Sequence, residues 1–384
     1  MTLLSIFLIV LCPFTALIPA AIMLYSVQKN KLLMFLNPLN VGLILLFAIA
    51  FISAVLNKDR IALLMSFGLL LYLSASIYIQ NHYYEEKSIE KLFHSTMLIS
   101  LISVFIGFIE KAASFFWDIT WISQVFWSPT YIPSQYAYRI YSTFGNPNVA
   151  GAWFACMFLV AFYFLEKASG KEMFKYGFYC FLFALSMLFT GSRGSILGLG
   201  AAILIFALFS DSKRTKAILM ISLFAVILAA LTLPVMNHSL NSRMPLWQQC
   251  MYLANEKPLF GWSLLGIFRQ TGEIHAHNIW ITIITTMGLL GLAIYAAIKL
   301  YLIKGLLLLY SKNCRLVPLL AAIQVFIVTH GLVDFTLLVP QIGMMFIISS
   351  SLISGLDRSY SIYPAINWNN LRDIILLKQP FPFF

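Results

Sequence analysis

Long apolar runs alternate with short polar turns along most of this chain. The runs repeatedly reach the roughly 17–25 residues that a helix needs to cross a bilayer, and the ten-residue alternation of an outer-membrane barrel is absent. The pattern predicts an all-α, polytopic integral membrane protein with about eleven transmembrane helices, within a range of about ten to twelve. We expect the crossings at 3–25, 36–56, 61–80, 93–110, 148–166, 176–191, 194–210, 217–236, 278–298, 316–333 and 338–356.

Composition supports the same class of protein. The 384 residues are 61% hydrophobic and only 10% charged, and their mean hydropathy is +0.87, which excludes an ordinary soluble domain. No Lys or Arg precedes the first apolar run, so we expect a membrane helix there rather than a cleaved signal peptide. The five cysteines show no paired spacing, so a structural disulfide is not expected.

Positive charge predicts the orientation of the chain, because Lys and Arg accumulate in cytoplasmic loops. Most of the 25 Lys and Arg residues fall in one set of loops, which includes Lys299 and Lys304. That set is therefore predicted to be cytoplasmic, with the N-terminus outside and the C-terminus inside. The net charge of +11 reflects this bias and gives no reason to expect a nucleic-acid partner. The remaining cations are predicted to lie outside: Lys58, Arg60, Lys111, Arg139, Arg193, Arg243, Lys257 and Arg269.

Arg193 is the only charged residue between Tyr176 and Phe209. This run is too long for one crossing, so we expect a hairpin that breaks at 191–194 and places Arg193 near the outer headgroups. An arginine there needs an anionic partner. The partner could be an ordinary lipid phosphate, or it could be the phosphate of a bound substrate, which a guanidinium binds well.

Two outer segments carry further candidate residues. The first, at 111–147, is rich in aromatic residues and could be an interfacial belt or a substrate-facing rim. Arg139 lies near its end, and Asn146-Pro147-Asn148 breaks regular structure, with Asn148 able to cap the next helix. The second, at 236–277, places Arg243 and Trp247 on one face if it is helical. Arg243 could bind substrate there or contact lipid phosphate.

Three histidines and one carboxylate lie near predicted membrane boundaries. His275 and His277 could suggest a metal site, but only Glu273 is nearby in the sequence as a further ligand, so no metal is expected. A neutral imidazole at this position could instead act as a general base or be purely structural. His330 and Asp334 are spaced i,i+4 near the end of a crossing, where an ionisable pair could be functional or could join helices.

In order along the chain, several of these elements resemble motifs of the O-antigen ligase and O-antigen polymerase superfamily of bacterial envelope enzymes. The ligase-type motif is His277-Asn278, nine residues, then Gly288-Leu289-Leu290-Gly291. Other matching elements are Phe144–Asn148, Thr190–Gly194, Ser242-Arg243 with Trp247, Pro258–Trp262 and His330 with Asp334-Phe335. Ser263 stands where that family pattern has its last glycine.

The resemblance implies a membrane glycosyltransferase with a GT-C-like architecture. Its donor would be a glycan on undecaprenyl diphosphate, and its acceptor a hydroxyl of another glycan, of lipid A-core or of a different envelope molecule. Neither metal nor ATP would be needed, so no cofactor is expected. The site would lie at the outer face of the bacterial cytoplasmic (inner) membrane, in contact with membrane lipids.

The same resemblance implies roles for individual residues. His277 would act as the base, with Asp334 orienting or charge-stabilising it. Arg193 and Arg243 would bind the diphosphate, with Arg139 and Arg269 as weaker candidates, and transfer would invert the anomeric centre. Supporting residues would be His275, Asn278, Asn146, Asn148, His330 and Trp247.

Three regions and three activities follow from this interpretation. We expect membrane helices and a first outer loop at 1–140, a ligase-like membrane domain at 141–356 with its outer loop at 237–277, and a cytoplasmic tail at 357–384. The His-Asn spacing favours a ligase, and a polymerase that uses the same donor is the alternative. A transporter is a third possibility, although no internal repeat is visible.

Overall fold

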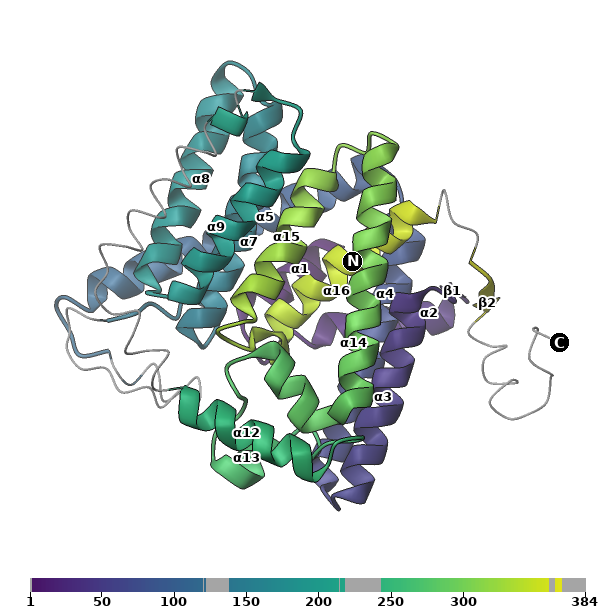
Figure 1. The fold of residues 1–384 in the computed structure, drawn as a ribbon. Helices are drawn as coiled ribbons and strands as arrows, with labels where there is room; N and C mark the ends of the chain where they lie inside the picture. Colours follow the sequence, from purple (N-terminus) through teal and green to yellow (C-terminus); the bar gives the residue numbers. More distant parts are fainter. Residues whose placement is uncertain are drawn as a thin grey trace.

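The computed structural model describes residues 2–119, 121, 138–213, 215–217, 243–358 and 363–367, and this part of the chain is almost entirely helical (Figure 1). The helices of the first half are α1 Thr2–Leu11, α2 Ile18–Lys29, α3 Pro38–Leu56, α4 Arg60–His82, α5 Glu86–Ala113, α7 Pro147–Lys167, α8 Lys171–Phe189 and α9 Arg193–Phe209. Those of the second half are α12 Met244–Glu256, α13 Gly266–Thr271, α14 Ile279–Ser311, α15 Val317–His330 and α16 Pro340–Asp357, with the 3-10 turn η2 at Thr336–Leu338.

The helices have the apolar character of a membrane protein. Among the described residues, six helices are long and apolar enough to cross a bilayer, namely α3, α4, α5, α7, α8 and α14. The helices α9 and α15 are apolar but shorter. The all-α membrane class is therefore confirmed, whereas the count of eleven crossings and the GT-C-like architecture stay predictions.

The expectation of a single first crossing at 3–25 is wrong. The segment forms two helices, α1 and α2, separated by a turn at 13–17. Pro13 has no N–H for the helical hydrogen bond, and its ring clashes with the preceding turn, so α1 ends before it. Pro19 then lies in the first turn of α2, where a proline is tolerated.

The expected hairpin around Arg193 is present. Helix α8 ends at Phe189, Gly191 adopts a left-handed conformation with φ of +61°, and α9 begins at Arg193. The side chain of Ser192 caps α9 by accepting a hydrogen bond from the N–H of Ser195. This turn fixes Arg193 as the first residue of a helix.

Helix α14 was expected as one straight crossing from 278 to 298, but it bends at Gly288, which has φ of +69° and ψ of −169°. The chain at 258–261 crosses α14 at this bend, where the N–H of Leu289 donates to the carbonyl of Pro258 at 2.7 Å. A Cβ on Gly288 would come within 2.2 Å of the Leu259 carbonyl oxygen, and one on Gly261 within 2.5 Å of the Thr286 backbone. Two glycines therefore allow the crossing and join two of the sequence motifs in space.

The same helix overturns the assignment of Lys299 and Lys304 to a loop. Helix α14 continues to Ser311, so both lysines lie within it. Lys299 is 8% exposed and donates a hydrogen bond to Gln324 at 2.9 Å. The apolar pattern ended the crossing too early because a lysine with a buried polar partner looks like a loop residue in the sequence.

Some predictions fall outside the described residues. They are the crossing at 217–236, residues 120 and 122–137 of the aromatic segment, Ser242, and the tail beyond 367. Within the tail, β2 (Ala365–Asn367) pairs antiparallel with β1 (Leu33–Phe35), with Leu33 opposite Asn367. This short two-stranded ribbon is the part of the fold that an all-helical prediction did not anticipate.

Candidate active site

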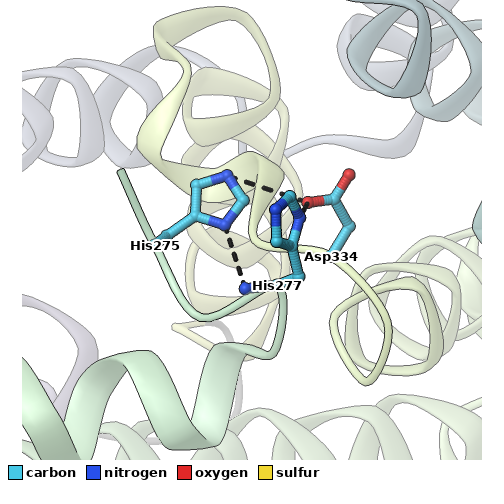
Figure 2. Close-up of side chains that lie close together, drawn as sticks. All are labelled: His275, His277 and Asp334. Atoms are coloured by element: carbon cyan, nitrogen blue, oxygen red, sulfur yellow. Dashed lines mark hydrogen bonds and ion pairs between the residues drawn. The ribbon is translucent and has the colours of Figure 1, made fainter. Parts of the chain in front are cut away.

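A hydrogen bond between His277 Nδ1 and Asp334 Oδ1, at 3.1 Å, forms the centre of the site (Figure 2). His277 directly precedes the cap of α14, and Asp334 follows α15. A carboxylate only accepts hydrogen bonds, so Nδ1 carries the ring proton and Nε2 keeps its lone pair. The His277 side chain is 30% exposed, whereas that of Asp334 is 7% exposed. The pair therefore combines an accessible imidazole with a buried acid.

The charge of Asp334 is maintained in spite of burial. Burial raises the pKa of Asp334, but the hydrogen bond from His277 and the neighbouring histidines lower it, and the resulting pKa lies below the usual range. Asp334 is therefore a carboxylate at neutral pH. A buried carboxylate on Nδ1 orients an imidazole and stabilises the imidazolium that forms when Nε2 takes a proton.

His275 supports this pair from the preceding loop. Its Nδ1 accepts a hydrogen bond from the backbone N–H of His277 at 3.1 Å, and its Nε2 lies 3.8 Å from Asp334 Oδ1 (Figure 2). Burial lowers the pKa of His275 to about 4, although Asp334 acts in the opposite direction. His275 is thus neutral at pH 7. Its contact with the backbone holds His277 in a left-handed conformation with φ of +51°.

The ends of α14 and α15 are joined tightly around these side chains. Asn278 caps α14 by accepting from the N–H groups of Trp280 and Ile281, and its amide donates to the carbonyl of Leu332 at 3.0 Å. Trp247 of α12 donates from Nε1 to the carbonyl of Ala276 at 2.7 Å. Both supporting residues therefore fix the His275–His277 loop against neighbouring helices.

Arginines bring positive charge to the same place. Arg243 directly precedes α12 and donates to the carbonyl of Val333, which is next to Asp334. Burial lowers the pKa of Arg243, and the charge of Arg193 lowers it further, while Asp334 raises it. The pKa of Arg139 is lowered by burial and by Arg193 and Arg243, and raised by Tyr141 and Asp334. The three arginines are thus close enough to affect one another.

Arg139 links the two motifs that flank this cluster. Its Nε donates to the carbonyl of Thr190 and its Nη2 to Asn148 Oδ1, each at 2.6 Å. The cap of α7 is Asn146, which accepts from the N–H of Asn148, so the expectation that Asn148 is the cap is wrong. Pro147 occupies the first helical position, which leaves Asn146 as the cap and directs Asn148 to Arg139.

A comparison with known protein families matches a segment that contains several of these residues. Residues 178–296 match the family model described as O-antigen ligase, and the matched segment contains Arg193, Arg243 and His277. Over this segment the chain is similar to the O-antigen ligase family. The predicted resemblance is confirmed for residues 178–296, and it supports a membrane enzyme of the O-antigen ligase or polymerase type. No match was found among curated proteins.

Two residues of the O-antigen ligase prediction lie apart from the central pair. His330 is buried at the end of α15, stacks on Phe326 and lies near Thr336 Oγ1 at 3.4 Å. It does not hydrogen-bond the Asp334 side chain, although its carbonyl accepts from the Asp334 N–H. Arg269 forms an ion pair with Asp59 at 3.3 Å and belongs to a different part of the surface.

From the sequence, Asp334 could not be recognised as a third possible metal ligand beside His275 and His277. Nitrogens of His275 and His277 and an oxygen of Asp334 all lie within 4.8 Å of one another and could hold a metal ion. The neighbour considered from the sequence, Glu273, is exposed and lies outside this group. The spacing of 57 residues between His277 and Asp334 gives no local signal of their contact. The absence of a metal stays a prediction.

Glu110 is a supporting residue that the sequence reasoning missed. It is 7% exposed and accepts hydrogen bonds from the hydroxyl of Tyr138 and from the N–H groups of Tyr141 and Ser142. These contacts anchor the segment that carries Arg139. A single acid at the end of an apolar run, as at Glu110, was the available signal, because such an acid needs polar partners.

Proposed function

We propose that this protein transfers a glycan from undecaprenyl diphosphate to a hydroxyl of an envelope acceptor, in the manner of an O-antigen ligase. The observation that carries the proposal is the His277–Asp334 hydrogen bond beside three mutually interacting arginines. A base next to a cationic cluster fits a reaction that removes a proton from a hydroxyl and releases a diphosphate. The proposed location is the outer face of the cytoplasmic membrane.

The reaction follows from the chemistry of these groups. His277 Nε2 takes the proton of the acceptor hydroxyl as its oxygen attacks the anomeric carbon. The bond from that carbon to the diphosphate oxygen breaks, and the configuration inverts. Arg193 and Arg243 stabilise the negative charge that develops on the leaving diphosphate, with Arg139 as a further cation. The arginines supply charge stabilisation without a metal or ATP, so chelators are expected to leave the rate unchanged.

Substitution of the two central residues tests the proposal. With purified protein and a labelled lipid-linked glycan, His277→Ala and Arg193→Ala should each reduce transfer by about 10²–10⁴-fold, the range of general acid–base and electrostatic contributions. The matched controls are His82→Ala and Lys171→Gln. His82 is the last residue of α4, and Lys171, like Arg193, is the first residue of a helix. Wild-type rates in His277→Ala or Arg193→Ala would refute the assignment.

The products separate the remaining activities. Addition of one intact glycan to a non-carrier acceptor identifies a ligase, whereas a ladder of longer carrier-linked glycans identifies a polymerase. Movement of the lipid-linked glycan across a sealed vesicle without any new glycosidic bond would identify a transporter and contradict the proposal.

A further inference from the structure

A cavity lies at the end of the α3–α4 hairpin, apart from the His277 pair. It has a volume of about 560 Å³ and is lined by the α3–α4 turn on one side and by residues of the α12–α13 region on the other. Figure 1 shows α12 and α13 beside this end of the hairpin, at the bottom of the view. The segment 272–276 connects α13 directly to His277.

The lining of this cavity is strongly cationic. It contains Lys58, Arg60, Lys257 and Arg269, but Asp59 is its single carboxylate. Asp59 is already engaged, because it caps α4 through the N–H of Ala62 and pairs with Arg269. Across the described ranges, neither Lys58 nor Arg60 has an ion-pair partner. Positive charge therefore exceeds negative charge in the cavity by three.

This concentration of charge works against local stability. Arg60 is the first residue of α4, where the helix dipole disfavours a cation. Lys58 has φ of +53°, a left-handed conformation that a residue with a Cβ adopts at a cost. A bound anion near the N-terminus of α4 would offset the unfavourable concentration of positive charge there. An unfavourable arrangement that a ligand would relieve is typical of a binding site.

The walls of the cavity are held in place without a ligand. Lys257 Nζ lies 3.5 Å from the centre of the Trp262 ring and donates to Asn57 Oδ1. The amide of Asn57 donates to the carbonyl of Gly261 at 3.1 Å, which joins the hairpin turn to the chain that crosses α14. Because Lys257 covers one face of Trp262, recognition here depends on charge and hydrogen bonds rather than on stacking of a sugar on that face.

From these features we infer that the cavity binds an anionic group, phosphate or carboxylate, carried by the saccharide acceptor. The identity of the bound molecule as the acceptor rests on the proposed glycan transfer, whereas the anion site itself is defined by the four cations. Asn57 and Gln270 add amide groups that can hydrogen-bond sugar hydroxyls. The cavity thus selects acceptors that bear a negative charge and directs them toward the His277 loop.

Binding is measured first, independently of transfer. The full-length protein in phosphatidylcholine nanodiscs is titrated with glucose 6-phosphate and, separately, with neutral glucose. We expect saturable binding of the phosphate sugar, at least tenfold weaker binding in Lys58→Gly/Arg60→Gln, and no binding of glucose. Lys171→Gln, a cation at the start of α8 and outside the cavity, is the matched control and should bind normally.

One further variant, a Tm measurement and one lipid distinguish the sources of a signal. Arg193→Ala should retain the component of binding that Lys58→Gly/Arg60→Gln weakens, because Arg193 belongs to the other cluster. The Lys58→Gly/Arg60→Gln variant should show a Tm equal to or above that of the wild type, since the substitutions remove a left-handed lysine and a cation from a helix N-terminus. Unchanged binding in this variant, or loss of binding in nanodiscs that contain phosphatidylglycerol, would overturn the inference, the latter by identifying a lipid headgroup as the ligand.

Transfer assays then connect the cavity to the reaction. In Lys58→Gly/Arg60→Gln, KM for an anionic acceptor should rise at least tenfold, while slow hydrolysis of the donor by water stays at the wild-type rate. If the wild type binds glucose 6-phosphate but transfers no glycan, the proposed function fails and the anion site stands. If transfer occurs with an unchanged KM in the variant, the anion site fails and the proposed function stands.

Discussion

Two regions of this protein bury a cation among helices, and they do so in opposite ways. Around Lys299, one charge is surrounded by partners: Gln324 accepts from it, Gln324 in turn donates to Ser349 and Ser350, and the Phe346 ring lies 4.4 Å away. Around His277, Arg139 and Arg243 interact electrostatically with Asp334 and with Arg193, and the imidazole is partly exposed.

The difference separates a structural charge from a functional one. The Lys299 network joins α14, α15 and α16 through side chains of the protein itself. The His277 cluster carries a surplus of positive charge and an imidazole with an accessible nitrogen, which is an arrangement that a bound anion and a bound hydroxyl would complete. Burial alone therefore does not identify the active site, but an accessible base beside a surplus of positive charge does.

The strongest test of this comparison is Asp334→Asn. The neutral amide removes the negative charge that stabilises the imidazolium of His277, and an NH₂ group turned toward Nδ1 would favour the opposite tautomer. We expect transfer to fall by up to about 10⁴-fold, the loss for the corresponding carboxylate of a serine protease. The measurement is kcat with the lipid-linked donor in excess.

The control for Asp334→Asn is the intactness of the fold. Asp334 Oδ1 also accepts from the N–H of Phe335 at 2.8 Å, a bond that the asparagine oxygen can retain. The variant should therefore be extracted and purified like the wild type, with a similar Tm. Activity within tenfold of the wild type would show that Asp334 does not assist His277.

Lys299→Met should show the reverse of Asp334→Asn, because it should lower the stability of the fold and leave the rate of transfer nearly unchanged. It removes the donor to Gln324, and a buried acceptor left without its partner costs about 1–3 kcal/mol. Transfer should stay within about threefold of the wild type. The readouts are Tm in detergent and kcat, measured in parallel with Asp334→Asn.

A second substitution sharpens the Lys299 result. Replacing Gln324 by leucine in the Lys299→Met background removes the orphaned acceptor, so Tm should recover at least in part. A large loss of kcat in Lys299→Met without a change in Tm would place Lys299 with the functional group instead.

The sequence predicted most of the secondary structure and the residues of the site, for physical reasons that act locally. Apolar runs of the right length predicted α3, α4, α5, α7, α8 and α9, and the glycines beside Arg193 predicted the hairpin. Contacts between distant segments could not be predicted in the same way. The crossing at Gly261 and Gly288 and the meeting of His275 with Asp334 depend on how the segments pack.

The smallest predicted effect is the dependence of stability on pH, to which His275 contributes and Lys299 does not. Its pKa is about 4 in the folded protein and about 6.5 in an unfolded chain, so only the unfolded state takes up a proton between these values. The contribution of His275 to the free energy of unfolding is therefore fully present above pH 6.5. It is lost as the pH falls toward 4, by an amount on the order of 1–3 kcal/mol. We expect Tm to decline over this window in the wild type. In His275→Gln the amide oxygen can accept from the His277 N–H, and the decline should be shallower, whereas Lys299→Met should keep the wild-type slope. Parallel slopes for the wild type and His275→Gln would mean that the acid sensitivity arises at groups other than His275.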